Sequence, residues 1–171
     1  AAYLSTMAAY SMGSGLVYLS IIKECIPQLS VLVPEAVFVP YESINEDFSA
    51  LKKKIEESDA LLIGPGLGTN ENAGELLKMV ISSCDKPLVL DADALNLIAE
   101  DICLLDGLIG EAVITPHPAE MARLSGITAA KVQEDRIGTA KRFAEEYGVT
   151  VVLKGAATVI VSNDGKAAIN P

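Results

Sequence analysis

The sequence predicts an α/β protein with a mostly parallel central sheet. Over residues 60–153, short apolar runs rich in β-branched residues alternate with helical patterns. Alternation of strand and helix is typical of doubly wound α/β domains, and continuously apolar strands are typical of parallel strands covered on both faces. The chain has 171 residues, half of them apolar, which is enough for one substantial core. We therefore expect a single domain over 1–171.

The boundaries of the elements follow from glycines and from hydrophobic periodicity. Gly13 stops the first helix and Gly148 the last, and Phe48, Leu51 and Ile55 share one face of an amphipathic helix. Helices are expected over 1–12, 45–57, 73–82, 94–99, 120–124 and 129–147. Strands are expected over 16–21, 37–39, 60–63, 87–90, 112–114 and 150–153.

The end of the chain departs from this alternation. Two apolar runs, 158–161 and 166–169, flank Asp164-Gly165, a pair of residues typical of a hairpin turn. We expect a β-hairpin there, with an unpaired outer edge. Since the chain also begins inside a helix, we expect that segments are missing at both ends.

Composition restricts the class of partner. The formal net charge is −10, which argues against nucleic acid, because that partner requires basic contacts to phosphate. No apolar stretch reaches the roughly 20 residues of a membrane span. The three cysteines have no metal-ligand spacing, and an odd number argues against a disulfide framework. We expect a reduced, cytoplasmic protein.

Four loops that follow predicted strands carry the residues suited to binding. They cover 64–68, 91–96, 115–120 and 154–158. In open α/β sheets, ligands bind beyond the carboxyl ends of the strands. The four loops therefore predict one site, for a phosphorylated ligand.

The first two loops offer glycines and carboxylates. Gly66 lies in a glycine-rich turn that either lets a ligand approach the backbone or is a plain strand-to-helix connection. Asp91 and Asp93 alternate along the chain, so an extended backbone would turn both to one pocket, where they would organise a hydrated Mg²⁺. Alternatively, one of them caps the helix at 94–99. Asn96 either caps or binds the ligand.

The other two loops offer a histidine and a lysine. His117, the only histidine, lies between two prolines and either presents its ring to a ligand or is structural. Glu120 is an early-turn acid favoured by the helix dipole. Lys154 suits phosphate, unless it extends into solvent. The small side chains that follow it would let a nucleotide lie against the backbone of Gly155, Ala156, Ala157 and Thr158.

Five motifs follow one another along the chain: G-S-G-L-V over 13–17, I-G-P-G-L-G over 63–68, L-D-A-D-A-L-N over 90–96, T-P-H-P-A-E-M-A-R-L over 115–124 and V-V-L-K-G-A-A-T over 151–158. In this order, they resemble the ADP/ATP-dependent NAD(P)H-hydrate dehydratases of the ribokinase-like superfamily. The resemblance covers nearly the whole chain. It implies a three-layer α/β/α domain, usually larger than this one.

The resemblance also implies a reaction and a site. ADP or ATP, with Mg²⁺, would phosphorylate the hydroxyl of hydrated NADH or NADPH, and elimination of phosphate would restore the dihydronicotinamide. Gly66 and His117 would contact this substrate, with Asp91, Asp93 and Asn96 in support at the mouth of the site. Residues 154–158 would line the nucleotide site. The family commonly forms homo-oligomers, often tetramers.

The sequence departs from the family pattern at two points. Ala119 stands where the family usually has glycine, a mild change unless that position requires φ > 0. The family's G-G-x-G-D motif, whose aspartate is the base, would follow Pro171, so we expect no catalytic residue in this chain and no activity from it alone. Two alternatives are a ribokinase-like kinase for a small alcohol such as a vitamin precursor, and a non-catalytic nucleotide-binding module.

Overall fold

The computed structural model describes residues 1–41 and 48–171. By its contacts the chain divides into two compact units, Ala1–Ser58 and Asp59–Pro171, and we describe each by itself. The first three residues of the helix expected over 45–57 lie outside the described part of the chain. The expectation of one domain over 1–171 stays a prediction.

The first unit is a two-stranded parallel sheet with helices. Its elements are α1 (Ala2–Ser11), β1 (Tyr18–Ile22), the short 3₁₀ helix η1 (Lys23–Cys25), α2 (Ile26–Leu32), β2 (Val37–Tyr41) and α3 (Ser49–Glu57). β1 pairs with β2, α1 contacts β1, and α2 and α3 contact β2. The sequence-based prediction missed α2, which begins with proline in its first turn. Phe48 lies just outside α3, in a left-handed conformation.

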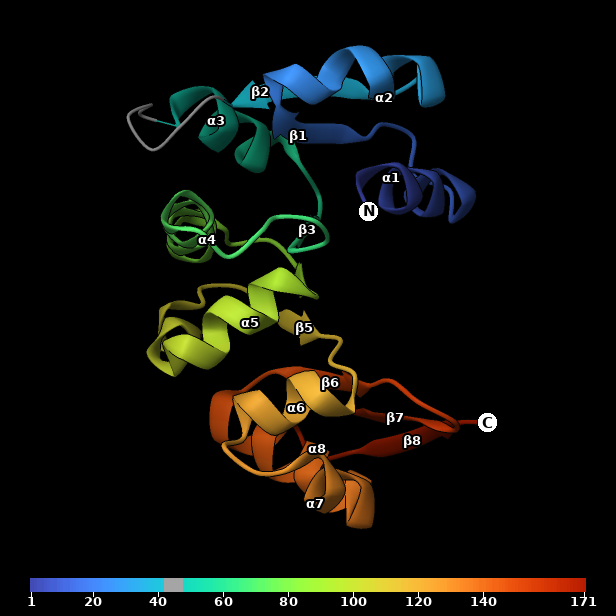
Figure 1. Ribbon diagram of the computed structural model, residues 1–171, viewed down its shortest axis with the longest axis vertical. Coiled ribbons are helices and arrows are strands. Elements are labelled where there is room, and N and C mark those ends of the chain that lie inside the picture. Colours follow the sequence, from blue (N-terminus) through green and yellow to red (C-terminus); the bar gives the residue numbers. More distant parts are fainter. Residues whose placement is uncertain (42–47) are drawn as a thin grey trace. The chain divides into compact units, whose positions relative to one another are not determined.

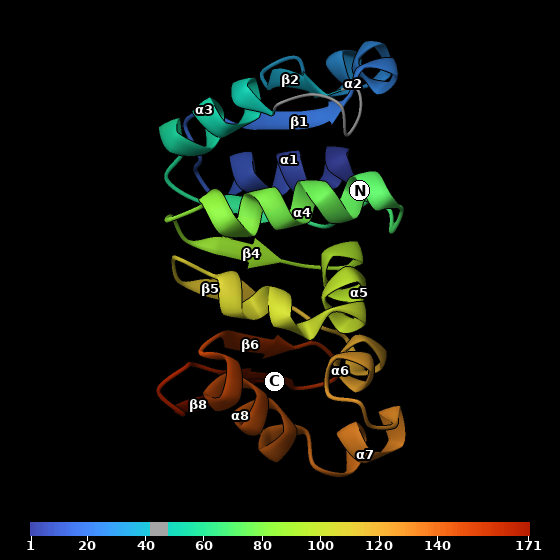
Figure 2. The same cartoon turned by 90° about the vertical axis from the view of Figure 1, so that its left-hand side faces the viewer.

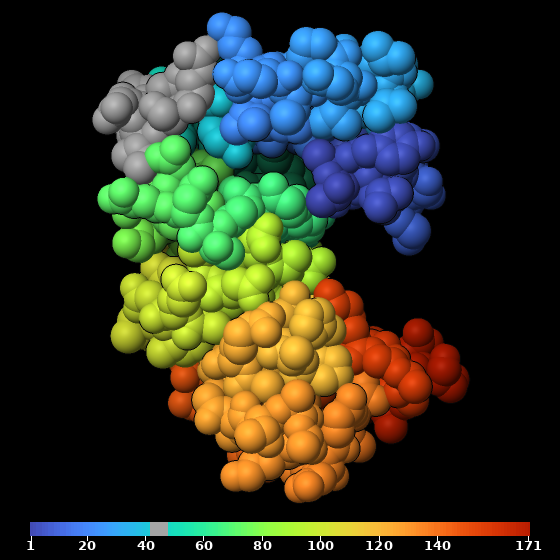
Figure 3. All heavy atoms as spheres, in the orientation of Figure 1, coloured from blue at the N-terminus to red at the C-terminus, as the bar shows by residue number. Residues whose placement is uncertain are grey.

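The second unit is built on one mixed sheet with the strand order β3-β4-β5-β6-β7-β8. The strands are β3 (Leu61–Ile63), β4 (Leu88–Leu90), β5 (Ala112–Ile114), β6 (Thr150–Leu153), β7 (Thr158–Val161) and β8 (Ala167–Asn170). The first four are parallel, and β7 and β8 are antiparallel. This confirms the α/β class, the mostly parallel sheet and the terminal hairpin. β8 is exposed along its length, as an edge strand, at the surface in Figure 3 (red).

Helices connect the parallel strands. They are α4 (Glu71–Ser83), α5 (Asp93–Glu100), the 3₁₀ helix η2 (Ile102–Gly107), α6 (Pro118–Leu124), α7 (Ala129–Glu134) and α8 (Arg136–Tyr147). Because neighbouring parallel strands follow one another in sequence and such crossovers are right-handed, these helices belong on one face of the sheet. The two views show α4 and α8 lying along this face (Figures 1 and 2).

The core of this unit lies between that face and the helices. Leu90, Ile114 and Leu153 are buried on the strands, and Leu77 and Phe143 are buried on α4 and α8. Alternate strand residues are only half-buried, so burial alternates with the period of two expected of a strand. None of the described helices is long and apolar enough to cross a membrane.

The helix expected over 129–147 is two helices, and the prediction of one long helix is wrong. Asp135 separates α7 from α8 with a non-helical backbone, φ −141° and ψ 71°. Its carboxylate accepts a hydrogen bond of 2.8 Å from the amide of Gly138, so Asp135 caps α8. The end of α8 at Gly148, with φ 66°, is as predicted.

Candidate functional site

The four polar loops lie side by side at the carboxyl edge of the parallel strands. The ladder continues past the strand ends, where Asp91 N donates to Ile63 O at 3.1 Å and Thr115 N donates to Leu90 O at 3.1 Å. Lys154 N donates to Pro116 O at 2.8 Å. Backbone pairing therefore places the loops that follow β3, β4, β5 and β6 next to one another.

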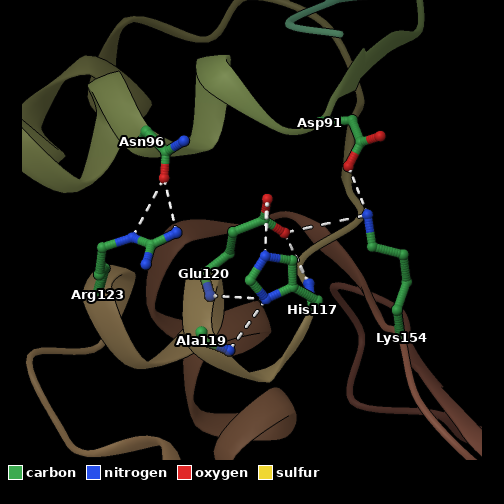
Figure 4. A network of polar contacts seen from close by, with 7 residues as sticks. All are labelled: Asp91, Asn96, His117, Ala119, Glu120, Arg123 and Lys154. Carbon is green, nitrogen blue, oxygen red and sulfur yellow. Dashed lines mark hydrogen bonds and ion pairs between the residues drawn. The ribbon is translucent and has the colours of Figure 1, made fainter. Parts of the chain in front are cut away.

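Lys154 joins two of these loops through its side chain. Its Nζ donates to Asp91 Oδ1 at 2.7 Å and lies 4.0 Å from Glu120 Oε2 (Figure 4). Lys154 and Asp91 are partly exposed, whereas the Glu120 side chain is 7% exposed. A single ammonium thus lies between two carboxylates. Burial acts to raise the pKa of Asp91, but hydrogen bonds from Lys154 and Thr115 outweigh it and hold this pKa below its usual value.

His117 is the N-cap of α6. Its Nδ1 accepts hydrogen bonds from the amides of Ala119 at 3.1 Å and Glu120 at 3.3 Å. Glu120 Oε2 accepts one from His117 N at 2.7 Å, which completes a capping box. An acceptor Nδ1 requires the proton of a neutral ring to be on Nε2, which lies 3.4 Å from Glu120 Oε1. The structural role of His117 is established, and a ligand that bound Nε2–H would have to share it with Glu120 Oε1.

The Ala119 substitution is accommodated by the same cap. Ala119 lies in the first turn of α6, and it is not one of the described non-glycine residues with positive φ. Its amide donates a hydrogen bond to His117 Nδ1, and this bond does not depend on the side chain. The position therefore does not require glycine.

The glycine-rich loop needs glycine at Gly64. This residue has φ 122°, and a Cβ there would collide with the carbonyl oxygen of Asp91 and lie 2.8 Å from the Cβ of Ala94. Gly66 has φ 75° and is exposed. Gly68 N donates to Asp93 Oδ2 at 2.8 Å. The loops that follow β3 and β4 are therefore closely packed and hydrogen-bonded to each other.

The assumption of an extended backbone between the two aspartates is wrong. Ala92 has φ 52° and ψ −116°, so Asp91 bonds to Lys154 while Asp93 bonds to Gly68 N. The N-cap of α5 is Ala92, without a side-chain cap, so neither aspartate caps it. Among residues 1–41 and 48–171, no group of three or more His, Cys, Asp or Glu side chains could hold a metal ion. The carboxylates of Asp91 and Asp93 are each hydrogen-bonded to a different protein partner instead.

Asn96 belongs to a separate pair. Its Oδ1 accepts hydrogen bonds from Arg123 Nε at 3.1 Å and Nη2 at 2.8 Å (Figure 4). Asn96 lies on α5 and Arg123 on α6, so the pair connects the two helices. Its role as a ligand contact stays a prediction.

The loop after β6 has an unusual backbone. Gly155 has φ 149° and Ala157 has φ 56°, and Thr158 Oγ1 donates to Gly155 O at 3.2 Å. Residues 155–157 are exposed. The predicted nucleotide loop is therefore open to solvent, and one hydrogen bond within it joins Thr158 to Gly155.

Arg136 holds this loop, and the sequence-based prediction missed it. Its Nη1 donates to Ala156 O at 2.6 Å, and its Nη2 donates to Leu153 O at 3.1 Å and Lys154 O at 3.4 Å. The predicted helix over 129–147 places Arg136 in its interior, where no special role is expected. The overlooked signal is Asp135 three residues before Gly138, a pattern typical of an aspartate cap.

The sheet and its loops define a class of protein that comparison with solved structures identifies as ribokinase-like, with a three-layer α/β/α fold. A ribokinase-like superfamily protein from Enterococcus faecalis has a TM-score of 0.86 and 29% identity, covering 99% of this chain and 57% of the other. An ADP/ATP-dependent NAD(P)H-hydrate dehydratase from Bacillus subtilis, co-crystallised with ATP and Mg²⁺, has a TM-score of 0.78 and 28% identity, covering 99% and 58%.

Sequence comparison identifies the family. A family model described as NAD(P)H-hydrate dehydratase matches residues 1–171, and this chain belongs to that family. A bifunctional NAD(P)H-hydrate repair enzyme from Moorella thermoacetica is 40% identical over 174 residues, covering 98% of this chain. The chain spans 33% of the length of that relative.

Proposed function

We propose that this chain forms the ligand-binding part of an enzyme that repairs hydrated NADH or NADPH. ADP or ATP would transfer its terminal phosphoryl group to the ring hydroxyl that hydration adds, releasing AMP or ADP. Phosphate would then leave with the electron pair of its C–O bond while the neighbouring ring carbon loses a proton, which restores the double bond of the dihydronicotinamide. The observation that carries the proposal is the position of Lys154, whose ammonium lies at the same strand edge as His117 and Asp91. The similarity to an ADP/ATP-dependent NAD(P)H-hydrate dehydratase supports the choice of substrate and donor.

This chemistry depends on charge and position. Phosphorylation turns a poor leaving group into a good one, and the protein supplies orientation and compensation of phosphate charge. Lys154 suits the latter task, because an ammonium is a point charge that binds phosphate oxygens. Asp91 would have to share or release this ammonium when a phosphate arrives, since its Oδ1 holds it at 2.7 Å.

Each of the two ligands is assigned to its own loops at this edge of the sheet. The exposed backbone of Gly155, Ala156 and Ala157, together with Lys154 and Thr158, would hold the nucleotide. The exposed Gly66 and the Nε2–H of His117 would contact the hydrated dinucleotide. Asp91, Asp93 and Asn96 would support the loops rather than touch the reacting atoms. We assign no catalytic base among residues 1–41 and 48–171.

Magnesium would enter with the nucleotide. Mg²⁺ keeps several waters and is usually held by phosphate oxygens with one or two carboxylates. That mode of binding agrees with the lack of a three-ligand cluster in the described part of the chain. No step of the proposed mechanism depends on a protein-held ion.

We further propose a cytoplasmic homo-oligomer, with a tetramer as the expected state. Cys25, Cys84 and Cys103 are free thiols, which agrees with a reducing compartment, and homo-oligomers are common in the family that the motifs resemble. Light scattering of the intact protein during size-exclusion chromatography measures the oligomeric state. A monomer at micromolar concentration would contradict this part of the proposal.

The test of the function uses the intact protein. We would incubate it with hydrated NADH, Mg²⁺ and either ADP or ATP, and follow the return of the dihydronicotinamide absorbance. We expect recovery that requires nucleotide, with a loss of about tenfold or more in kcat/KM for Lys154→Ala. Lys141→Ala is the control, because it removes the same charge from a residue of α8 outside the site. Nucleotide binding without recovery would point instead to a small-alcohol kinase or a binding module.

A further inference from the structure

We propose that Arg136 is a positioning residue that shapes the nucleotide loop 154–157 and supplies positive charge to it. The inference rests on the proposed function and names a residue that neither the motifs nor the family resemblance identified. Its ligand class is a nucleoside diphosphate or triphosphate.

The contacts of Arg136 are with the main chain of the loop. Its two terminal nitrogens donate to the carbonyls of Leu153, Lys154 and Ala156, at distances of 2.6 to 3.4 Å. A planar guanidinium presents its donors in a fixed fork. Three carbonyls drawn to one such fork hold the loop in one conformation.

The amides of the same loop are left available. Within the described part of the chain, the N–H groups of Gly155, Ala156 and Ala157 donate to no main-chain carbonyl. The carbonyls of Lys154 and Ala156 accept from Arg136, and that of Gly155 accepts from Thr158 Oγ1. Main-chain N–H groups that are not used by the protein are suitable donors for phosphate oxygens. Arg136 and Thr158 therefore occupy most of the carbonyl acceptors of this loop, and these three N–H donors are left to a ligand.

The charge of Arg136 is not neutralised by the residues described. The ion pairs among residues 1–41 and 48–171 involve other cations, and none of the carboxylates described there lies within ion-pair distance of the Arg136 guanidinium. Its Nε is buried and has no partner. In a chain with a net charge of −10, a cation held against main-chain carbonyls creates a local site that favours anions.

The guanidinium of Arg136 lies so close to Gly155 that it leaves no room for a side chain there. A Cβ at Gly155 would lie 2.9 Å from Arg136 Nη2, and the φ of 149° is unfavourable for other residues. The glycine of the nucleotide loop is thus explained by the arginine beside it. The break at Asp135 contributes as well, because it makes Arg136 the first residue of α8.

The experiment compares Arg136→Ala, Arg136→Lys and the control Lys141→Ala in the intact protein. Titration calorimetry with ADP and with ATP measures Kd, and steady-state repair gives kcat and the KM for nucleotide. Hydrogen exchange at the Lys154 amide, which bonds to Pro116 O at 2.8 Å, reports on the loop without any ligand.

For Arg136→Ala we expect a nucleotide Kd and KM about tenfold higher or more, faster exchange at the Lys154 amide, and kcat changed much less. Arg136→Lys should keep the charge but not the conformation of the loop, because an ammonium lacks the fork of donors. Exchange at the Lys154 amide should therefore remain faster than in the wild type. Lys141→Ala should resemble the wild type in all three measurements.

Three results would overturn the inference. They are a folded Arg136→Ala protein that binds nucleotide within twofold of wild type, an Arg136→Lys protein equal to wild type in both affinity and exchange, and loss of the fold in both variants. If the wild-type protein binds no nucleotide, the proposed function fails, while exchange at Lys154 still shows whether Arg136 positions the loop.

Discussion

Lys154 and Asp91 lie 63 residues apart in the sequence, yet Lys154 Nζ donates to Asp91 Oδ1 at 2.7 Å. The pair joins the end of β6 to the end of β4, across the intervening strand β5. Its position makes Asp91 the internal competitor of any phosphate that binds Lys154. The pair also connects the stability of the site to pH.

Acid should remove the contribution of this pair to stability. The pKa of Asp91 is below its usual 3.8, so its stabilisation is fully present above that pH and is lost as pH falls through the lowered value. We expect Asp91→Asn to unfold about 1 kcal/mol more easily at neutral pH. The difference should disappear in strong acid. Denaturant unfolding of both proteins over a pH series measures this, and a difference that grew with acidity would contradict it.

Substitution of Gly64 should be strongly destabilising. In Gly64→Ala, the Cβ would collide with Asp91 O, and the positive φ adds strain, so we expect a loss of about 3 kcal/mol or more in the free energy of unfolding. Gly74→Ala is the matched control. A Cβ at Gly74, within α4, meets nothing within 4 Å, and helix propensity predicts a gain of up to about 1 kcal/mol. Equal changes in the free energy of unfolding for Gly64→Ala and Gly74→Ala would refute the close contact between Gly64 and Asp91 O.

Two substitutions separate the cap role of His117 from a ligand role. His117→Ala removes the cap of α6, and we expect a loss of about 1 kcal/mol in the free energy of unfolding. His117→Asn should recover most of this stability, because asparagine is a good N-cap. Repair activity is then measured on the stable His117→Asn protein. Full activity there would show that the imidazole does not contact the substrate.

Asn96 and Arg123 should behave as a coupled pair. We expect the single alanine variants to destabilise the protein by amounts that do not add, with a coupling energy of about 0.5 to 1 kcal/mol in a double-mutant cycle. Chemical denaturation of the four proteins measures it. The KM for hydrated NADH should be little changed in Asn96→Ala. Additive stabilities with a raised KM would instead make Asn96 a substrate ligand.

Local sequence was sufficient for the strands of the second unit and for its helices α4, α5 and α6. Apolar, β-branched runs identified its strands, and Gly148 and the Asp164-Gly165 turn marked the end of α8 and the hairpin, because these signals depend on neighbouring residues only. Local sequence also carried a signal for the break between α7 and α8 at Asp135. Its carboxylate caps a helix by a local hydrogen bond, but the surrounding helical pattern concealed it.

The partners of the site residues were beyond the reach of the sequence. Nothing local shows that Asp93 bonds to Gly68 N rather than to a metal, or that Asp91 is paired with Lys154. Both aspartates were expected to face one pocket, and the left-handed backbone of Ala92 prevents the extended geometry on which that expectation rested.

The sequence by itself determined that four polar loops follow four parallel strands, because the parallel direction of strands follows from the alternation of short apolar runs with helices. Only the tertiary structure decided which side chains of those loops pair. Hydrogen bonds such as those from Lys154 to Asp91 and from Arg136 to Ala156 O act between atoms about 3 Å apart. Those distances depend on how the whole sheet brings its strand ends together.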